Sequence, residues 1–99
     1  MTRVQSNKLA AAAQLRQGDL DKAQQLLDDA RRLAPDDAEV HFMLAATAAT
    51  RGALDDAAAC CREAVRLRPD YREAVNALGE FLARLGRLDE AIRCYRDLA

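Results

Sequence analysis

The chain has 99 residues, which is enough for one compact domain with a modest core. Its 22 Ala, 14 Leu and 13 Arg, set against two Pro and four Gly, favour an all-α fold. The net charge of −1 excludes a general electrostatic attraction to nucleic acid or to an anionic membrane. No secretory signal is visible, and three cysteines, an odd number, fit a reducing cytoplasm. The Arg-rich, Lys-poor composition favours a bacterial origin.

An internal repeat runs through the whole chain. When the sequence is shifted by 34 positions, 20 of the 65 aligned pairs are identical, whereas composition alone predicts roughly 7. The triplets are Gly18/Gly52/Gly86, Leu20/Leu54/Leu88, Asp21/Asp55/Asp89 and Ala23/Ala57/Ala91. We therefore expect a single domain over residues 1–99, with repeats at about 4–37, 38–71 and 72–99.

Each unit contains two predicted helices. In chain order they cover residues 4–17, 20–33, 38–51, 54–67, 72–85 and 88–98. A glycine such as Gly18 can adopt a positive φ and end the first helix of each pair. Acidic residues open each second helix and basic residues close the first two of them, which suits the helix dipole. Pro35 and Pro69 then prevent the helix from continuing into the next unit.

Small residues mark where helices must approach closely. Ala23, Ala57 and Ala91 recur at the same point of each second helix, and larger side chains follow one turn later. These larger partners are Leu27, Cys61 and Tyr95. The pattern predicts that this face of each second helix packs inside the hairpin.

This arrangement resembles the tetratricopeptide repeat family. The third unit matches the family's frame best, through Val75, Leu78, Gly79 and Leu82 in its first helix and Ala91 and Tyr95 in its second. The resemblance implies an α-solenoid of three antiparallel helix pairs, wound as a right-handed superhelix. The first-helix signature is degraded in the first two units, which predicts loose packing of the first helix.

The resemblance implies that the chain binds a protein or peptide in a concave groove lined by the first helix of each pair. Its groove-facing positions hold Lys8, Arg16, Glu39, Phe42, Met43, Glu73, Asn76, Glu80 and Arg84, with Gln5, Ala12, Ala46 and Thr50 between them. Phe42 and Met43 would form a central apolar patch, and Asn76 could bond to a peptide backbone. The acidic residues favour a ligand with basic character. We expect Phe42→Ala to weaken binding and to leave folding nearly intact.

One branch of the family recognises acidic C-terminal tails through a clamp of basic and amide side chains. In this chain Lys8 occupies one clamp position, but the others hold Ala12, Met43, Glu73 and Ala77. Two required cations are missing, and an acid replaces one of them. The resemblance therefore implies no recognition of chaperone tails.

No motif for catalysis is present, neither a nucleophile elbow nor a phosphate loop nor a zinc-protease signature. We expect a non-enzyme that uses no cofactor and no metal. His41 occupies a position where the family prefers a packed aromatic residue, so a core role is expected. We interpret Cys60, Cys61 and Cys94 as small core residues.

The last helix raises two alternatives. Leu88, Ile92 and Tyr95 would have no following repeat to cover them, and exposed apolar surface of that kind marks an interface or a truncated array. One alternative is a homodimer formed through this uncapped C-terminal helix. The other is that the chain is the N-terminal module of a larger enzyme, such as a glycosyl- or sulfotransferase.

Overall fold

The computed structural model describes residues 1–98, with side chains described as far as Arg96. In this part of the chain the helices are α1 (Arg3–Gln17), α2 (Leu20–Leu33), α3 (Ala38–Thr50), α4 (Leu54–Leu67), α5 (Arg72–Arg84) and α6 (Leu88–Leu98). Every predicted helix is confirmed, with ends that differ by no more than one residue. Ala99, the last residue of the expected third repeat, lies outside the described residues.

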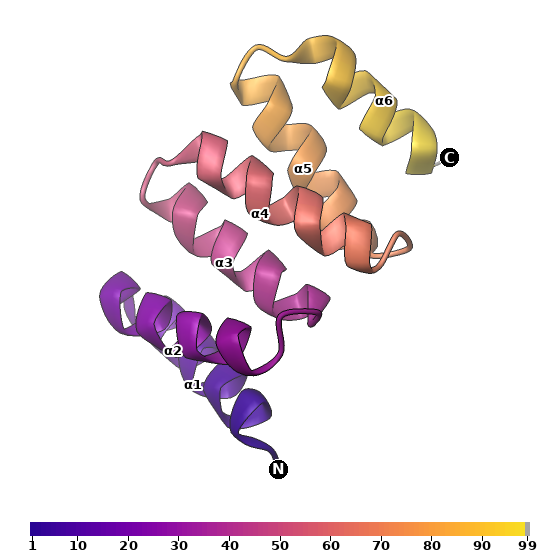
Figure 1. Ribbon diagram of the computed structural model, residues 1–99. Coiled ribbons are helices and arrows are strands. Elements are labelled where there is room, and N and C mark those ends of the chain that lie inside the picture. The colour runs from indigo at the N-terminus through magenta and orange to yellow at the C-terminus, as the bar shows by residue number, and fades with distance from the viewer. Residues whose placement is uncertain (99) are drawn as a thin grey trace.

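The helices form three antiparallel hairpins that stack side by side from the N-terminus to the C-terminus (Figure 1). Each helix packs mainly on its neighbours in the sequence, and α1 also touches α3. The described residues extend over 38 × 25 × 19 Å. An open stack in which α1 and α2 lie far from α6 is an α-solenoid and not a closed bundle, so the predicted fold class is confirmed.

Local signals in the sequence set the helix boundaries. Gly18, Gly52 and Gly86 have φ angles of 82°, 85° and 80°, and each lies within two residues of the end of a first helix, as expected. The helix α1 begins one residue earlier than predicted because Thr2 and Gln5 form a reciprocal capping box. Asp37 caps α3 by accepting hydrogen bonds from the backbone amides of Glu39 and Val40.

The core lies where the small residues were expected. The exposed fractions of Ala23, Ala57 and Ala91 are 0%, 0% and 3%. Leu27 and Cys61, one turn further along their helices, are fully buried. Tyr95 differs from these two residues, because its inner side lies against Gly79 while 44% of the side chain is exposed. The three hairpins therefore share one packing scheme, but Tyr95, which completes it in the third hairpin, is only half-buried.

None of the helices in residues 1–98 is long and apolar enough to cross a lipid bilayer.

Candidate binding face on α1, α3 and α5

The first helices of the three hairpins carry equivalent side chains at the same point of each repeat, and we call this surface the α1/α3/α5 face. Its rows are Gln5/Glu39/Glu73, Lys8/Phe42/Asn76, Leu9/Met43/Ala77, Ala12/Ala46/Glu80 and Arg16/Thr50/Arg84. None of these residues is fully buried, although other residues of α3 and α5 fill the core. A surface of this kind, presented on three rigid helices, can bind a partner without a change in the fold.

Lys8 connects the first two hairpins on this face. Its Nζ lies 3.0 Å from Oδ2 of Asp37 and 3.0 Å from Oε1 of Glu39. Burial acts to lower the pKa of Lys8, but the hydrogen bonds to Asp37 and Glu39 outweigh it, so the pKa is raised. Burial acts to raise the pKa of Asp37, but the bonds from Lys8 and from the amide of Val40 outweigh it, so that pKa is lowered. Lys8 thus helps to hold the first two hairpins together, and its charge on the α1/α3/α5 face is already neutralised.

Phe42 contributes to the core as well as to the face. Its ring meets that of Tyr71 edge to face, with centroids 5.2 Å apart, and it also packs against two of the buried clusters. The Tyr71 ring is held in turn by Arg68, whose guanidinium carbon lies 3.7 Å from the ring centroid. The expectation that Phe42→Ala leaves folding nearly intact is therefore wrong, because truncation would remove packing between α3 and Tyr71 at the start of α5.

An apolar stretch lies beside Lys8. Leu9 is 60% exposed, and it occupies the same row as Met43, which is half-buried against the core. A hollow of about 380 Å³ opens there, lined by Met1, Gln5, Lys8, Leu9 and Glu39. Leu9 is not among the residues that the sequence predicted for this face, although its position one repeat before Met43 was a usable signal.

The α5 end of the face is charged and open to solvent. Glu73 and Asn76 are exposed, and Glu73 makes no ion pair with another described residue. Glu80 pairs with Arg84 at 3.5 Å within α5, so their charges largely cancel. Arg16 is exposed at the far end of α1. Contacts thus link Lys8, Glu39 and Phe42 across helices, while Arg16 and the Glu80–Arg84 pair stay local.

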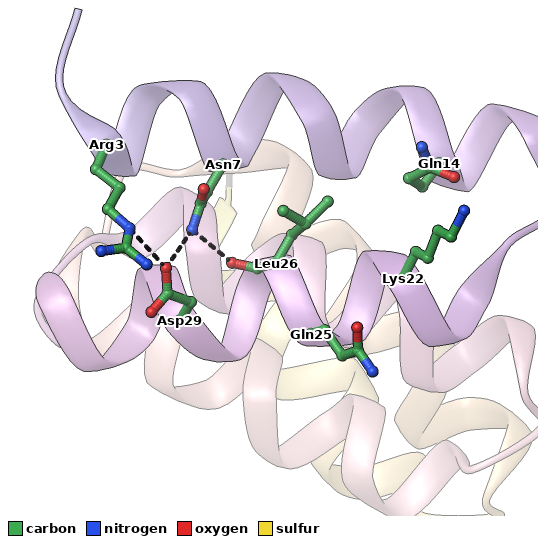
Figure 2. Close-up of a pocket in the computed structure, with 7 residues that line it drawn as sticks. All are labelled: Arg3, Asn7, Gln14, Lys22, Gln25, Leu26 and Asp29. Carbon is green, nitrogen blue, oxygen red and sulfur yellow. Dashed lines mark hydrogen bonds and ion pairs between the residues drawn. The ribbon is translucent and has the colours of Figure 1, made fainter.

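A second hollow, of about 440 Å³, lies between α1 and α2 (Figure 2). Arg3 and Asn7 both point at Asp29 there, with Arg3 Nε at 3.1 Å and Asn7 Nδ2 donating to Oδ2 at 2.8 Å. Asn7 also donates to the carbonyl oxygen of Leu26 at 3.2 Å. These bonds attach α1 to α2, and Ala11 is the one residue of α1 that is completely buried. The first helix is therefore sparse in apolar packing, as expected, but polar bonds and a capping box hold it.

The histidine and the two adjacent cysteines serve the fold. His41 is 9% exposed, and its Nε2 lies 2.8 Å from the carbonyl oxygen of Pro35, in agreement with the core role predicted for it. Cys61 is fully buried, and burial raises the pKa of its thiol to about 12. Burial also raises the pKa of Cys60, which packs at the edge of the core. The described residues hold no group of three or more His, Cys, Asp or Glu side chains that could bind a metal ion.

These observations define the class of the protein, a helical-repeat solenoid with an exposed face on the first helix of each hairpin. The sequence model of the tetratricopeptide repeat family matches residues 8–72 and 55–99. The chain belongs to this family, as the resemblance of its repeats implied. Among curated proteins, none matches the sequence.

Solved structures resemble the whole stack. The second tetratricopeptide domain of Spaghetti (RPAP3), bound to the HSP90 peptide SRMEEVD, is 18% identical with a TM-score of 0.92, and the match covers 98% of this chain and 90% of that one. The TPR2B domain of yeast Sti1, in a complex with pHsp70, is 18% identical with a TM-score of 0.91. That match covers 97% of this chain and 77% of the other. A crystal structure of MamA is 18% identical in sequence with a TM-score of 0.91, and the match covers 96% of this chain. This chain spans about half of the MamA chain, 56%. At such identities the likeness shows a shared fold only.

Proposed function

We propose that this chain is a non-catalytic scaffold that binds a segment of another protein along the α1/α3/α5 face, as an extended peptide or a helix. The observation that carries the proposal is the row pattern of this face: equivalent positions on the first helices of three successive hairpins stay accessible to solvent, while neighbouring positions on the same helices are buried. In this proposal the domain comprises the repeats at about 4–37, 38–71 and 72–99. Its ligands include no cofactor, nucleic acid or membrane, and a bacterial cytoplasm stays the predicted location.

The charges of the face favour a ligand with basic residues. Lys8 is neutralised by Asp37 and Glu39, and Arg84 is paired with Glu80. Glu73 is left as an exposed carboxylate without an ion-pair partner among the described residues. A lysine or arginine of the ligand can pair with Glu73, while the amide of Asn76, one turn away, can both donate to and accept from a peptide backbone.

An apolar side chain of the ligand would bind at the other end of the face. Leu9 and Met43 lie in one row beside the hollow between α1 and α3, and Leu9 is 60% exposed. A methionine side chain adapts its shape to different apolar partners. The proposed ligand therefore combines an apolar residue near Leu9 on the first hairpin with a basic residue near Glu73 on the third, two repeats further along the stack.

The same chemistry disfavours an acidic peptide such as SRMEEVD, to which the second Spaghetti domain is bound. A terminal carboxylate needs unpaired cations, but Lys8 is already held by two carboxylates. Glu73 would repel an acidic tail, and Ala12 and Ala77 offer no polar group. We expect the peptide SRMEEVD, with which the Spaghetti domain was solved, to show no saturable binding in a calorimetric titration.

Selection from a display library of random linear peptides tests the proposal. We expect the wild-type chain to enrich peptides that carry both an apolar and a basic residue, and Glu73→Lys to lose that enrichment. Asp55→Lys is the matched control, because Asp55 lies in the first turn of α4 as Glu73 lies in the first turn of α5, so both changes cost the helix dipole alike. Enrichment that survives Glu73→Lys, or that fails equally with Asp55→Lys, would contradict the proposal.

A further inference from the structure

The outer side of α6 exposes a stripe of large apolar side chains. Leu88, Ile92 and Tyr95 are 59%, 53% and 44% exposed. They follow one another at intervals of four and three residues, so they lie on one side of the helix. The helix α6 is at the end of the stack farthest from α1 and α2 (Figure 1). We call these three residues the α6 stripe.

The equivalent face of the preceding hairpin is covered by a helix. Leu54, Ala58 and Cys61 of α4 are the counterparts of the stripe one repeat earlier, and Ala58 and Cys61 are only 2% and 0% exposed. They belong to one core cluster with residues of α5. By its place in the repeat, the α6 stripe is thus a surface that fits a helix laid along it.

Charges beside the stripe indicate which helix fits. Asp89 near the start of α6 and Arg96 near its end are seven residues apart, almost two full turns, and so lie on the same flank of the stripe. Both are exposed, and neither makes an ion pair with another described residue. Glu90, on the side facing α4, by contrast forms ion pairs with two arginines. Its Oε1 lies 2.8 Å from Nη2 of Arg62, and its Oε2 lies 2.5 Å from Nε of Arg87.

We infer that the α6 stripe binds the α6 stripe of a second copy of this chain, antiparallel, in a twofold-symmetric dimer. Antiparallel pairing lays the same flank of both helices together in opposite directions. Asp89 of each copy then meets Arg96 of the other, and Ile92 lies at the twofold axis. A parallel pair would leave these charges unmatched across the interface.

The opposite end of the stack offers no comparable partner for the stripe. On α1, the positions equivalent to the buried Val40 and Leu44 of α3 hold Ser6 and Ala10. A polar or small side chain there buries little apolar area against Ile92. Head-to-tail growth into a filament is therefore disfavoured relative to a closed dimer, and the inference does not depend on what the α1/α3/α5 face binds.

The expected dimer is weak and depends on concentration. The helix α6 has 11 residues and is about 16 Å long, so a single pair of such helices buries less than the roughly 1,200 Å² of a standard stable interface. Three apolar side chains from each copy with two ion pairs place its dissociation constant in the micromolar range or above. Raised salt should weaken it further, because the ion pairs are exposed at the rim.

Sedimentation equilibrium over the micromolar to millimolar range provides the test. We expect the wild-type chain to pass from monomer to dimer, and Ile92→Glu to raise the dissociation constant at least about tenfold by placing two carboxylates at the axis. Leu33→Glu is the control, since Leu33 is an aliphatic residue of α2 with a similar exposure of 50%. A chain that stays monomeric throughout, that forms species larger than dimers, or that dimerises as well with Ile92→Glu overturns the inference.

The antiparallel direction has its own test. Asp89→Arg gives a flank with two bases and Arg96→Asp gives a flank with two acids, so each variant alone should dimerise less than wild type. Mixed in equal amounts, the two variants should restore association to near the wild-type level, because each acid again meets a base. Circular dichroism of each variant before mixing checks that α6 is still helical. A mixture no stronger than its separate components overturns the antiparallel arrangement.

Discussion

The contact between Gly79 of α5 and the ring of Tyr95 on α6 can be probed with a single methyl group. A Cβ atom at residue 79 would lie 2.8 Å from Cζ of Tyr95, 2.9 Å from Cε1 and 3.1 Å from Cε2. Ordinary contacts between carbon atoms lie at about 3.5–4.0 Å. The ring must therefore move away by roughly 0.5–1 Å if Gly79 is replaced by alanine.

Two opposing effects set the magnitude of Gly79→Ala. Inside a helix, alanine is more favourable than glycine by about 1 kcal/mol. Overpacking a buried contact costs about 1–3 kcal/mol, here reduced by the partial exposure of Tyr95, which lets the ring shift. We expect a net loss of about 1 kcal/mol, which for a domain of this size lowers the Tm by about 4–8 °C.

In a Tyr95→Ala background the obstruction is gone, and Gly79→Ala should then raise the free energy of unfolding by about 1 kcal/mol. The coupling between the two positions is thus about 2 kcal/mol. Urea and thermal unfolding of the four chains, followed by far-UV circular dichroism at low protein concentration, measures it. An equal gain in stability from Gly79→Ala in both backgrounds would refute the packing of α6 across Gly79.

Three further predictions follow from the core and the ion pairs. Ala57→Leu should lower the free energy of unfolding by about 1–3 kcal/mol in a urea titration, because Ala57 is fully buried where α4 meets its neighbours. Because the pKa of Asp37 is lowered in the folded chain, its ionised carboxylate contributes fully to the free energy of unfolding above the unfolded pKa of about 3.9, and this contribution is lost as the pH falls through the folded pKa. Asp37→Asn keeps an N-cap residue but cannot ionise, so it should lose less stability at low pH than wild type in urea titrations at several pH values. Iodoacetamide labelling read by mass spectrometry should modify Cys60 before Cys61, because Cys61 is fully buried with a pKa of about 12; equal rates in the folded chain would contradict the structure.

The sequence was sufficient for the fold because its local and long-range signals agree. The glycines after each first helix and the prolines between units mark boundaries that the structure places within one residue of the predicted ones. The alanines at 23, 57 and 91 identify the closest helix contacts, since only a small side chain allows two helices to approach there. The constant period of the repeat adds the stacking order to these local signals.

The candidate face was less predictable, because side chains on it also bond to one another. The repeat aligns Asp37 with Tyr71, so it concealed both the N-cap of Asp37 and the ring contact between Tyr71 and Phe42. Lys8 was correctly placed on the face, but its neutralisation depends on Asp37, a residue 29 positions away. Family positions locate a side chain on a face, whereas three-dimensional contacts decide whether its charge is available to a ligand.

The measurement that tests the proposed role of the α1/α3/α5 face most directly is heteronuclear NMR of the labelled chain titrated with a peptide selected from the display library. We predict that the amide shifts caused by the peptide concentrate in α1, α3 and α5, between the row of Leu9 and Met43 and the region of Glu73. Shifts centred on α2, α4 or α6, with α1, α3 and α5 unchanged, would contradict the account.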